Sequence, residues 1–362
     1  MDARHMESGF TTNAERDRLP SNSEWSRRPR GGGDRDAAPR GSFGPLDADK
    51  KDWDYRRQVH PEALMIRFVV ICSLAWFSVT PDASAQSCQA SGVAIQILGS
   101  GGPRMNRDRA SASYLVWIDG RSKILVDAGG GAFLRFGQAD ARIEDLSLIA
   151  ISHLHPDHVS DLPALLWGDM LRKAPLAIAG PSGNDAVPSF PTFLSHLFDQ
   201  KQGAFQVLAG TLGGSSGRGI PLKVTVVDVT KSEASTVLGE GDVAVSASGI
   251  PHGNIPALAY RVRTPKATIV FSTDQTGTNQ RFVDFARGAD ALVMHLAIAA
   301  GATSPLHASP AVVGRVARDA QVKRLLLSHI GQFDLGAAVA EVKESYTGPL
   351  VVGADLQCTP VP

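Results

Sequence analysis

The sequence has no excess of charge of either sign. Its 362 residues include 36 Lys and Arg and 36 Asp and Glu, so the formal net charge is +0 with histidine neutral. Domains that bind nucleic acid usually carry a basic excess, because Lys and Arg contact the phosphates. The balance argues against an RNA substrate without excluding a local basic patch. The content of 43% hydrophobic and 20% charged residues is ordinary for a folded, soluble protein.

The apolar run from Phe68 to Val79 is too short to cross a bilayer comfortably. It follows a basic residue, Arg67, and precedes Ala83-Ser84-Ala85, which fits a small-residue cleavage site. This order is typical of a secretory signal peptide. We therefore predict a signal peptide at 65–85, a periplasmic or secreted location, and no stable membrane anchor.

Residues 1–64 are rich in Arg, Asp, Gly, Pro and Ser and show no sustained apolar period. Such a segment cannot bury enough apolar surface to offset its conformational entropy, which predicts disorder. Since a signal peptide stands at the N-terminus of the translated chain, Met65 is a candidate true start, with residues 1–64 an upstream mis-extension. The alternative is a genuine tail ahead of a short core helix or membrane anchor. Residues 86–362 are expected to form one large α/β domain.

Cysteine is scarce, with three in the whole chain. Cys72 lies inside the predicted signal peptide, which leaves Cys88 and Cys358 in the mature domain. An even pair in an oxidising compartment predicts a disulfide between the two ends of that domain. Two unrelated free thiols are the alternative, because sequence does not give the distance between them.

The pattern along the mature domain alternates β-branched apolar runs with stretches of helical spacing, and no repeat of fixed short period is visible. Asp119-Gly120 predicts a hairpin turn, and residues 207–219 are expected to form a flexible loop by composition. Strands are expected within 92–102, 112–127, 145–152, 175–181, 221–229, 241–253, 257–264, 267–274 and 322–329. Helices are expected within 132–141, 161–174, 191–203, 309–320 and 337–346.

The segment "SHLHPDH" follows a predicted buried strand and brings together His153, His155, Asp157 and His158. Imidazole and carboxylate groups at this spacing can serve two metal ions, and they suit zinc and, less selectively, iron or manganese. The alternative is a polar cluster that only caps the following helix, but capping needs one side chain and gives no reason for three histidines. Asp161 is a candidate N-cap, with Pro163 in the first turn.

Three more candidate ligands stand at or just beyond predicted strand ends: His252, Asp274 and His329. An α/β scaffold assembles a site from the ends of several strands at one rim. Each of the three taken alone is equally consistent with a structural or capping role. Their joint placement favours ligation.

Residues 93–352 resemble the metallo-β-lactamase superfamily, within it the branch of ribonuclease Z, the arylsulfatases of this fold and related phosphodiesterases. The matching motifs are "LGSGG", "LVDAGGG", "SHLHPDH", "IAGPSG", "PHGNIPALAYR", "FSTDQ" and "VKRLLLSH". The resemblance implies an α/β fold, specifically a four-layer αββα sandwich.

The resemblance also implies two Zn²⁺ ions per chain, with Fe or Mn as alternatives. One metal would be held by His153, His155 and His252, the second by Asp157, His158 and His329, with Asp274 bridging; Asp127 would orient the ligand loop.

The resemblance further implies the chemistry. A hydroxide activated by a dinuclear zinc centre would cleave an ester, Asp157 would take or steer its proton, and His307 in "TSPLHASP" would protonate the leaving group. Ribonuclease Z pairs that histidine with a glutamate, where this chain has Leu296 in "VMHLAI". The relay is incomplete, which makes tRNA processing a poor expectation.

The function expected from these observations is metal-dependent hydrolysis of a small anionic ester, a phosphodiester or sulfate ester first. The alternatives are a ribonuclease Z-like endonuclease, a lactonase, an iron-dependent oxidoreductase of the same superfamily, and a non-catalytic metal-binding protein. The flavin-linked di-iron branch carries Glu in place of the second box histidine, so His155 argues against it. Nucleic acid is not expected as a partner, and a homodimer is a candidate assembly. Substrate choice is expected to depend on loops at 106–109, 188–219 and 277–280.

Overall fold

The computed structural model describes residues 88, 91–169, 172–215 and 217–362. The predictions for residues 1–64, for the signal peptide at 65–85 and for Cys72 fall outside these described residues. Within the described ranges, no helix combines the length and apolar character that a membrane span requires.

Two seven-stranded mixed sheets form the centre of the domain. The first sheet has the order β14-β1-β2-β3-β4-β5-β6, and the second has the order β13-β12-β11-β10-β9-β8-β7. The strands of the first sheet are β1 (Val93–Gly99), β2 (Ser113–Ile118), β3 (Arg121–Val126), β4 (Leu148–Ala150), β5 (Leu176–Pro181), β6 (Leu222–Val227) and β14 (Cys358–Val361). Those of the second are β7 (Ser235–Glu240), β8 (Val243–Ile250), β9 (Ala257–Arg263), β10 (Thr268–Phe271), β11 (Ala291–His295), β12 (Leu325–Ser328) and β13 (Leu350–Val352).

The two sheets pack face to face through one apolar core. In β1, Val93, Ile95 and Ile97 face this core, whereas Ala94 and Leu98 face the opposite side of the sheet. All seven residues of β1 are buried. A strand covered on both faces reads as a continuous apolar run, which is why its sequence does not alternate with polar residues.

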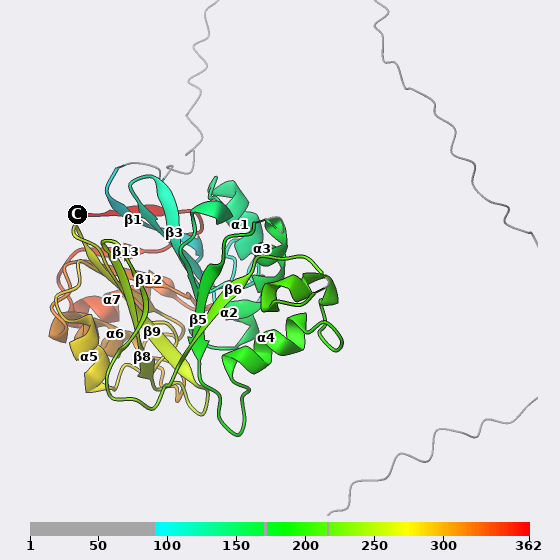
Figure 1. Ribbon diagram of the computed structural model, residues 1–362. Coiled ribbons are helices and arrows are strands. Elements are labelled where there is room, and N and C mark those ends of the chain that lie inside the picture. Colours follow the sequence, from blue (N-terminus) through cyan, green and yellow to red (C-terminus); the bar gives the residue numbers. More distant parts are fainter. Residues whose placement is uncertain (1–87, 89–90, 170–171, 216) are drawn as a thin grey trace, which may run out of the picture. The chain divides into compact units, whose positions relative to one another are not determined.

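Helices cover the outer face of each sheet (Figure 1). The first sheet carries α1 (Ala132–Gln138), α2 (Pro156–Val159), α3 (Leu162–Gly168) and α4 (Phe190–Phe198), with 3-10 helices at Ile143–Asp145 and Gln206–Leu212. The second sheet carries α5 (Gln280–Ala286), α6 (Pro310–Asp319) and α7 (Leu335–Ser345). The four layers confirm the predicted αββα sandwich.

Local details differ from the sequence-based expectations. Strands β7, β11, β13 and β14 and helix α5 were not predicted. Asp161 occupies the N-cap position of α3, but its carboxylate accepts hydrogen bonds from the backbone N–H groups of Gly131 and Phe133 instead of capping its own helix. It thereby satisfies two N–H groups at the start of α1, which would otherwise lack partners. The stretch 207–219, expected to be a flexible loop, lies partly in the 3-10 helix Gln206–Leu212, which buries Leu208 and Ala209.

Parallel pairing directs several chain reversals to the same edge of the sandwich. Strand β3 is parallel to β4, and β10, β11 and β12 are parallel to one another. The carboxyl ends of parallel strands meet at one edge of a sheet, so the segments that follow them are brought together. Those segments carry the candidate ligands.

The two ends of the described domain are joined by a disulfide between Cys88 and Cys358, which confirms the predicted pairing. Strand β14, which begins at Cys358, pairs antiparallel with β1, so the C-terminal strand lies beside the first strand of the domain (Figure 1). The bond closes a loop with a sequence separation of 270 residues. A cross-link across so long a loop restricts the unfolded chain strongly.

We predict that a Cys88→Ser, Cys358→Ser double variant loses about 2–5 kcal/mol of unfolding free energy, because its unfolded state regains the conformational freedom of the loop. Equilibrium urea denaturation, monitored by circular dichroism, measures the loss. Wild-type protein in excess reductant is the control and should show a similar loss. Unchanged stability in both would show that the cross-link adds nothing.

Candidate metal centre

The candidate ligands come from loops at one edge of both sheets. His153, His155, Asp157 and His158 follow β4 and enter α2, which starts at Pro156. His252 follows β8, Asp274 follows β10, and His329 follows β12. Short connections from buried strands leave these side chains little freedom, so the rigid sheets fix where they point.

The first ligand group consists of His153, His155, His252 and Asp274, whose ligand atoms all lie within 4.8 Å of one another. Nε2 of His153 lies 3.0 Å from Nδ1 of His155, and Nε2 of His252 lies 3.4 Å from that same Nδ1. Oδ2 of Asp274 lies 3.8 Å from Nε2 of His153 and 3.7 Å from Nε2 of His252. Three imidazoles and a carboxylate thus converge on one point.

The second ligand group consists of Asp157, His158 and His329, again with ligand atoms within 4.8 Å of one another. Oδ2 of Asp157 lies 3.1 Å from Nε2 of His329 and 3.6 Å from Nε2 of His158. Asp274 reaches this group as well, because its Oδ2 lies 3.6 Å from Nε2 of His158 and its Oδ1 lies 3.4 Å from Nε2 of His329. The structure therefore brings together all seven candidate ligands, and one carboxylate is common to both groups.

Asp127 orients two of the histidines without belonging to either group. Its Oδ2 lies 2.8 Å from Nδ1 of His158 and accepts a hydrogen bond from the Ser152 hydroxyl, also at 2.8 Å. The Ser152 hydroxyl in turn lies 2.9 Å from Nδ1 of His153. With both Nδ1 atoms engaged, the Nε2 atoms of His153 and His158 face the ligand groups. Partners of this kind fix the tautomer and the ring orientation of metal-binding histidines.

Three residues at the site adopt left-handed backbone conformations that non-glycine residues seldom occupy. They are Asp127, Thr273 and His329, with φ angles of 59°, 50° and 51°. Each stands directly after or within two residues of a strand end. Such conformations cost of order 1–3 kcal/mol each and persist where the surroundings determine them. Here the sharp turns direct the side chains of the site toward its centre.

The electrostatics of the cluster favour ionised carboxylates. Burial would raise the pKa of Asp274, but His329, His158 and His295 together lower it well below its usual value. Burial lowers the pKa of His153 well below its usual value, so this ring is neutral. Burial would lower the pKa of His158 too, but Asp127 and Asp274 raise it well above its usual value. A metal ion at the second group would displace the proton of His158.

The donor set fits divalent metal ions. Nε2 of His158 is buried and has no hydrogen-bond partner within the described part of the chain, although Nδ1 of the same ring is engaged. A buried polar atom without a partner lowers the stability of the fold, unless a hydrogen bond or a metal ion engages it. Imidazole nitrogens and carboxylate oxygens are the ligands that zinc takes, and iron and manganese accept them as well. The His and Asp clusters are therefore able to bind metal.

Sequence reasoning missed His295, which ends β11 and lies at the centre of the site. Its Nδ1 lies 2.6 Å from Oδ1 of Asp274, and its Nε2 lies 2.8 Å from the Tyr114 hydroxyl. Both ring nitrogens are thus engaged, so His295 holds Asp274 in place. Burial, followed by the charge of His329, lowers its pKa to about 3. The available signal was the apolar run that precedes it in "ALVMH", which forms β11 but was not predicted as a strand.

His307 lies on the loop before α6, close to the ligands. Its Nδ1 lies 3.7 Å from Oδ1 of Asp274. The same loop orients a ligand, because the Leu306 carbonyl lies 2.9 Å from Nδ1 of His252. Burial lowers the pKa of His307 to about 4, with smaller lowering contributions from His329 and His252. Leu296, by contrast, is fully buried in the apolar core beneath α5, α6 and α7.

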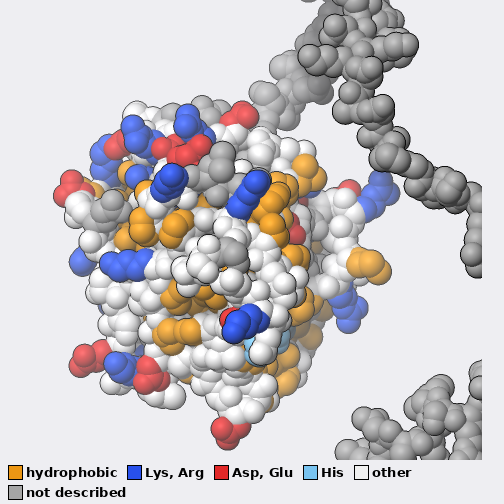
Figure 2. Space-filling model, turned by 45° about the vertical axis from the view of Figure 1, so that its right-hand side comes forward, with side chains coloured by type: hydrophobic (Ala, Val, Ile, Leu, Met, Phe, Trp, Pro, Cys, Tyr) orange, Lys and Arg blue, Asp and Glu red, His pale blue; other side chains and the backbone are white. Residues whose placement is uncertain are grey.

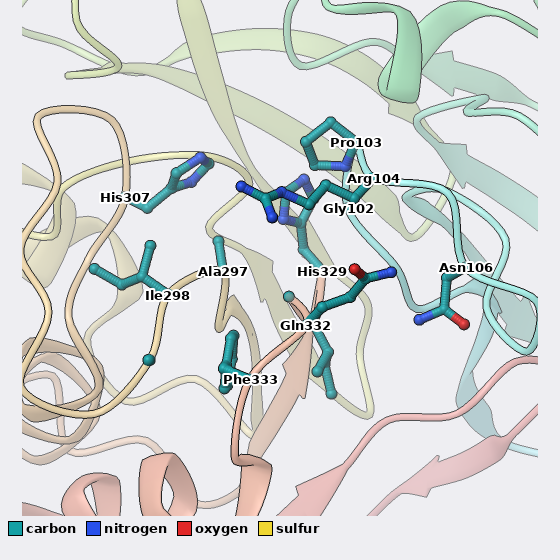
Figure 3. Close-up of a pocket in the computed structure, with 13 residues that line it drawn as sticks. Gly102, Pro103, Arg104, Asn106, Ala297, Ile298, His307, His329, Gln332 and Phe333 are labelled. Atoms are coloured by element: carbon teal, nitrogen blue, oxygen red, sulfur yellow. The ribbon is translucent and has the colours of Figure 1, made fainter.

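A cavity of about 350 Å³ opens beside this centre (Figure 3). His307 and His329 line it, together with residues of the loop after β1 and of the loop after β12. Figure 2 shows one face of the molecule, on which basic and acidic side chains are intermixed and no broad basic field is seen. The volume suits a small molecule or one end of a larger one.

Comparison with known proteins places the chain in a family. Residues 122–330, more than half of the chain, match the Beta-lactamase superfamily domain, so the chain belongs to the β-lactamase superfamily. An uncharacterized protein of Mycobacterium leprae is 27% identical over 266 residues, which cover 71% of this chain and 85% of that protein. The ribonuclease Z of Alkaliphilus oremlandii is 36% identical over 91 residues, but this stretch is 25% of this chain and only 28% of that enzyme.

Solved structures show the same fold. The metallo-β-lactamase fold protein YhfI from Bacillus subtilis superposes with a TM-score of 0.59 and 19% identity, covering 74% of this chain and 98% of that one. The short form of human tRNase Z gives a TM-score of 0.58 and 18% identity, covering 74% of this chain and 99% of that one. At these identities the likeness establishes the fold, and the site has to be judged on its own residues.

We predict that Tyr114→Phe lowers metal affinity about tenfold or more, because the loss of the hydroxyl frees His295 and, through it, Asp274. The ring that packs in the core stays. Titration with zinc against a competing chelator measures the affinity. Tyr346→Phe is the matched control, since its hydroxyl bonds the Val322 carbonyl away from the metal centre. Equal affinity of Tyr114→Phe and the wild type would contradict the positioning role of His295.

Proposed function

We propose that the protein is an exported metal-dependent hydrolase that uses two zinc ions to cleave a small anionic ester, a phosphodiester or sulfate ester. The single observation that carries the proposal is the position of Asp274. Its Oδ2 lies 3.6–3.8 Å from imidazole nitrogens of both ligand groups. A carboxylate shared in this way suits a pair of metal ions held close together, the arrangement found in many phosphoester-cleaving enzymes.

The first ion would be held by His153, His155 and His252, and the second by Asp157, His158 and His329, with Asp274 common to both. Such ions lower the pKa of bound water toward neutrality and polarise the group under attack. The protein would supply the orientation of the ligands. Asp127 and His295 keep the ligands in their orientations through the hydrogen bonds described above, so little reorganisation is needed when substrate binds.

Two residues would carry out the proton transfers. Asp157 is partly buried, with a side chain 9% exposed, and its carboxylate can accept a proton from the attacking water. His307 lines the cavity, and its imidazole can give a proton to the leaving oxygen. Burial lowers the pKa of His307 to about 4. An anionic substrate beside the ring would raise that pKa again, because a negative charge favours the protonated imidazole.

The size and charge of the surroundings support a small substrate. The cavity measures about 350 Å³, a size that suits a small molecule. The face of the molecule shown in Figure 2 has no broad basic field of the kind that would hold a polynucleotide. Leu296, which stands where ribonuclease Z has the glutamate partner of this histidine, is buried in the apolar core. A ribonuclease Z-like endonuclease is the second candidate, favoured by the sequence match to a protein of that name.

Export is part of the proposal, because of the disulfide. Cys88 and Cys358 are bonded, and such bonds persist in oxidising compartments such as the periplasm or the extracellular space. The signal-peptide pattern at residues 65–85 supports the same location.

A panel of chromogenic substrates tests the function. We expect zinc-loaded wild type to hydrolyse a phosphodiester or a sulfate ester in preference to a lactone or a β-lactam. The matched control is the His155→Ala, Asp157→Ala double variant, which removes one ligand from each metal group. Turnover of no ester beyond this control would refute the proposal, and preferential turnover of tRNA precursors would replace it with the second candidate.

The acid role of His307 has a separate signature. His307→Gln should lower kcat by about 10²–10⁴-fold for an ester with a poor leaving group such as phenol, because general acid catalysis is lost. The loss should be much smaller for 4-nitrophenol, which leaves without a proton. His196→Gln, on the exposed face of α4, is the matched control. Equal losses with both leaving groups would assign His307 another role.

A further inference from the structure

The cavity beside the metal centre has two chemically different walls. Arg104 and Asn106 line it from the loop after β1. Ala297, Ile298 and Phe333 give it an apolar side, from the loops after β11 and β12. Figure 3 shows the guanidinium of Arg104 extending from its loop into the space between these walls. No acidic side chain is found among the described residues that line the cavity.

Arg104 differs from the other arginines of its loop. Arg107 forms an ion pair with Asp108 at 3.4 Å, and Nη1 of Arg109 donates to the Ser100 hydroxyl at 2.7 Å and to the Gly353 carbonyl at 2.6 Å. Arg104 has neither an ion pair nor a hydrogen bond with any described residue, and it is exposed. Its five N–H donors are therefore available to a ligand.

The loop that carries Arg104 is held against the metal centre. The Gln332 side-chain amide donates to the Met105 carbonyl at 2.7 Å, which ties this loop to the one that follows His329. A Cβ at Gly102 would lie 2.8 Å from Cε1 of His329, so the backbone there packs directly on that ring. These contacts place Arg104 beside the centre before any ligand binds, which reduces the entropic cost of recognition.

Asn106 adds a second donor. Its Oδ1 accepts a hydrogen bond from the backbone N–H of Asp108 at 2.9 Å. That bond fixes which end of the amide is the oxygen and leaves the Nδ2 group, which faces the cavity in Figure 3, free to donate. The Arg104 guanidinium and the Asn106 amide N–H₂ both line the cavity, and each is a donor that suits an oxyanion.

We propose that Arg104 and Asn106 form a binding subsite for a carboxylate or phosphate group on the arm of the substrate that is not cleaved. The inference rests on the proposed function above, and it narrows the substrate class to esters with a second negative charge. The scissile group has to reach ligands that are almost fully buried, such as Asp274 at 3% exposure. Arg104 stands at the exposed mouth of the cavity, where it meets the remainder of the molecule. The apolar wall suits the carbon skeleton between the two charges.

Three esters that share one scissile bond test the subsite. They are 4-nitrophenyl phenyl phosphate and its analogues with a 4-carboxyphenyl or a 4-phosphonophenyl arm in place of phenyl. All release 4-nitrophenolate, so the chemistry is constant and only the charge of the distal arm changes. We expect wild type to favour at least one charged arm in kcat/KM by about tenfold or more, the size typical of a hydrogen bond between charged groups. The two analogues distinguish a carboxylate from a phosphate as the group recognised.

Arg104→Gln should reduce this preference to about one, whereas the matched control Arg107→Gln, which removes the same charge from the same loop, should keep it. The inference is overturned if wild type shows no preference, if Arg104→Gln retains it, or if both variants lose it equally. Wild type that turns over none of the three esters contradicts the proposed phosphodiesterase activity instead. In that case titration calorimetry with phenylphosphonate decides the subsite: about tenfold weaker binding to Arg104→Gln supports it, and equal binding overturns it.

Discussion

The site depends on one buried carboxylate, Asp274, which is within reach of both groups of imidazoles. Without Asp274 the two groups would be separate clusters of buried imidazole rings. Positive charge on one ring would then disfavour positive charge on its neighbours. With Asp274, a negative charge at the centre compensates the cations that such clusters attract. The surrounding structure serves this arrangement, since His295 and Tyr114 fix Asp274 from behind and Asp127 fixes the histidines that face it. The left-handed turns at Asp127, Thr273 and His329 show that the backbone accepts some strain to achieve it.

Much of this arrangement could be predicted from sequence because it follows strand ends. His153, His155, Asp157 and His158 are close along the chain, and a helix cap alone would need only one of them. His252, Asp274 and His329 were predicted because each follows a buried apolar run, and parallel strands bring such positions to one edge. His295 was missed because no strand was predicted over Ala291–His295, and its role is visible only with Tyr114 and Asp274 around it. Asp161 occupies the predicted N-cap position of α3, but sequence could not show that its carboxylate would bond the start of α1 instead of its own helix.

The substrate is constrained by features that no motif contains. The cavity, its apolar wall and the unpaired Arg104 arise where the described loops after β1, β11 and β12 meet, and these loops are far apart along the chain. Leu296 is the converse case, because the expectation against tRNA processing rested on a single apolar residue in a recognisable stretch. The structure shows only that this residue is buried in the core. The metal chemistry is thus tied to the strand ends and the specificity to the loops, which is how one fold supports different reactions.

The most direct test of the shared carboxylate is metal stoichiometry measured by inductively coupled plasma mass spectrometry on wild type and Asp274→Ala. Asp284→Ala, an exposed aspartate on α5, is the control for the loss of a carboxylate. We expect two metal ions per chain in wild type and in the control, and at most one in Asp274→Ala. One ion per chain in wild type, or two ions held by Asp274→Ala with unchanged affinity, would contradict the role of Asp274 as the carboxylate that both metal ions share.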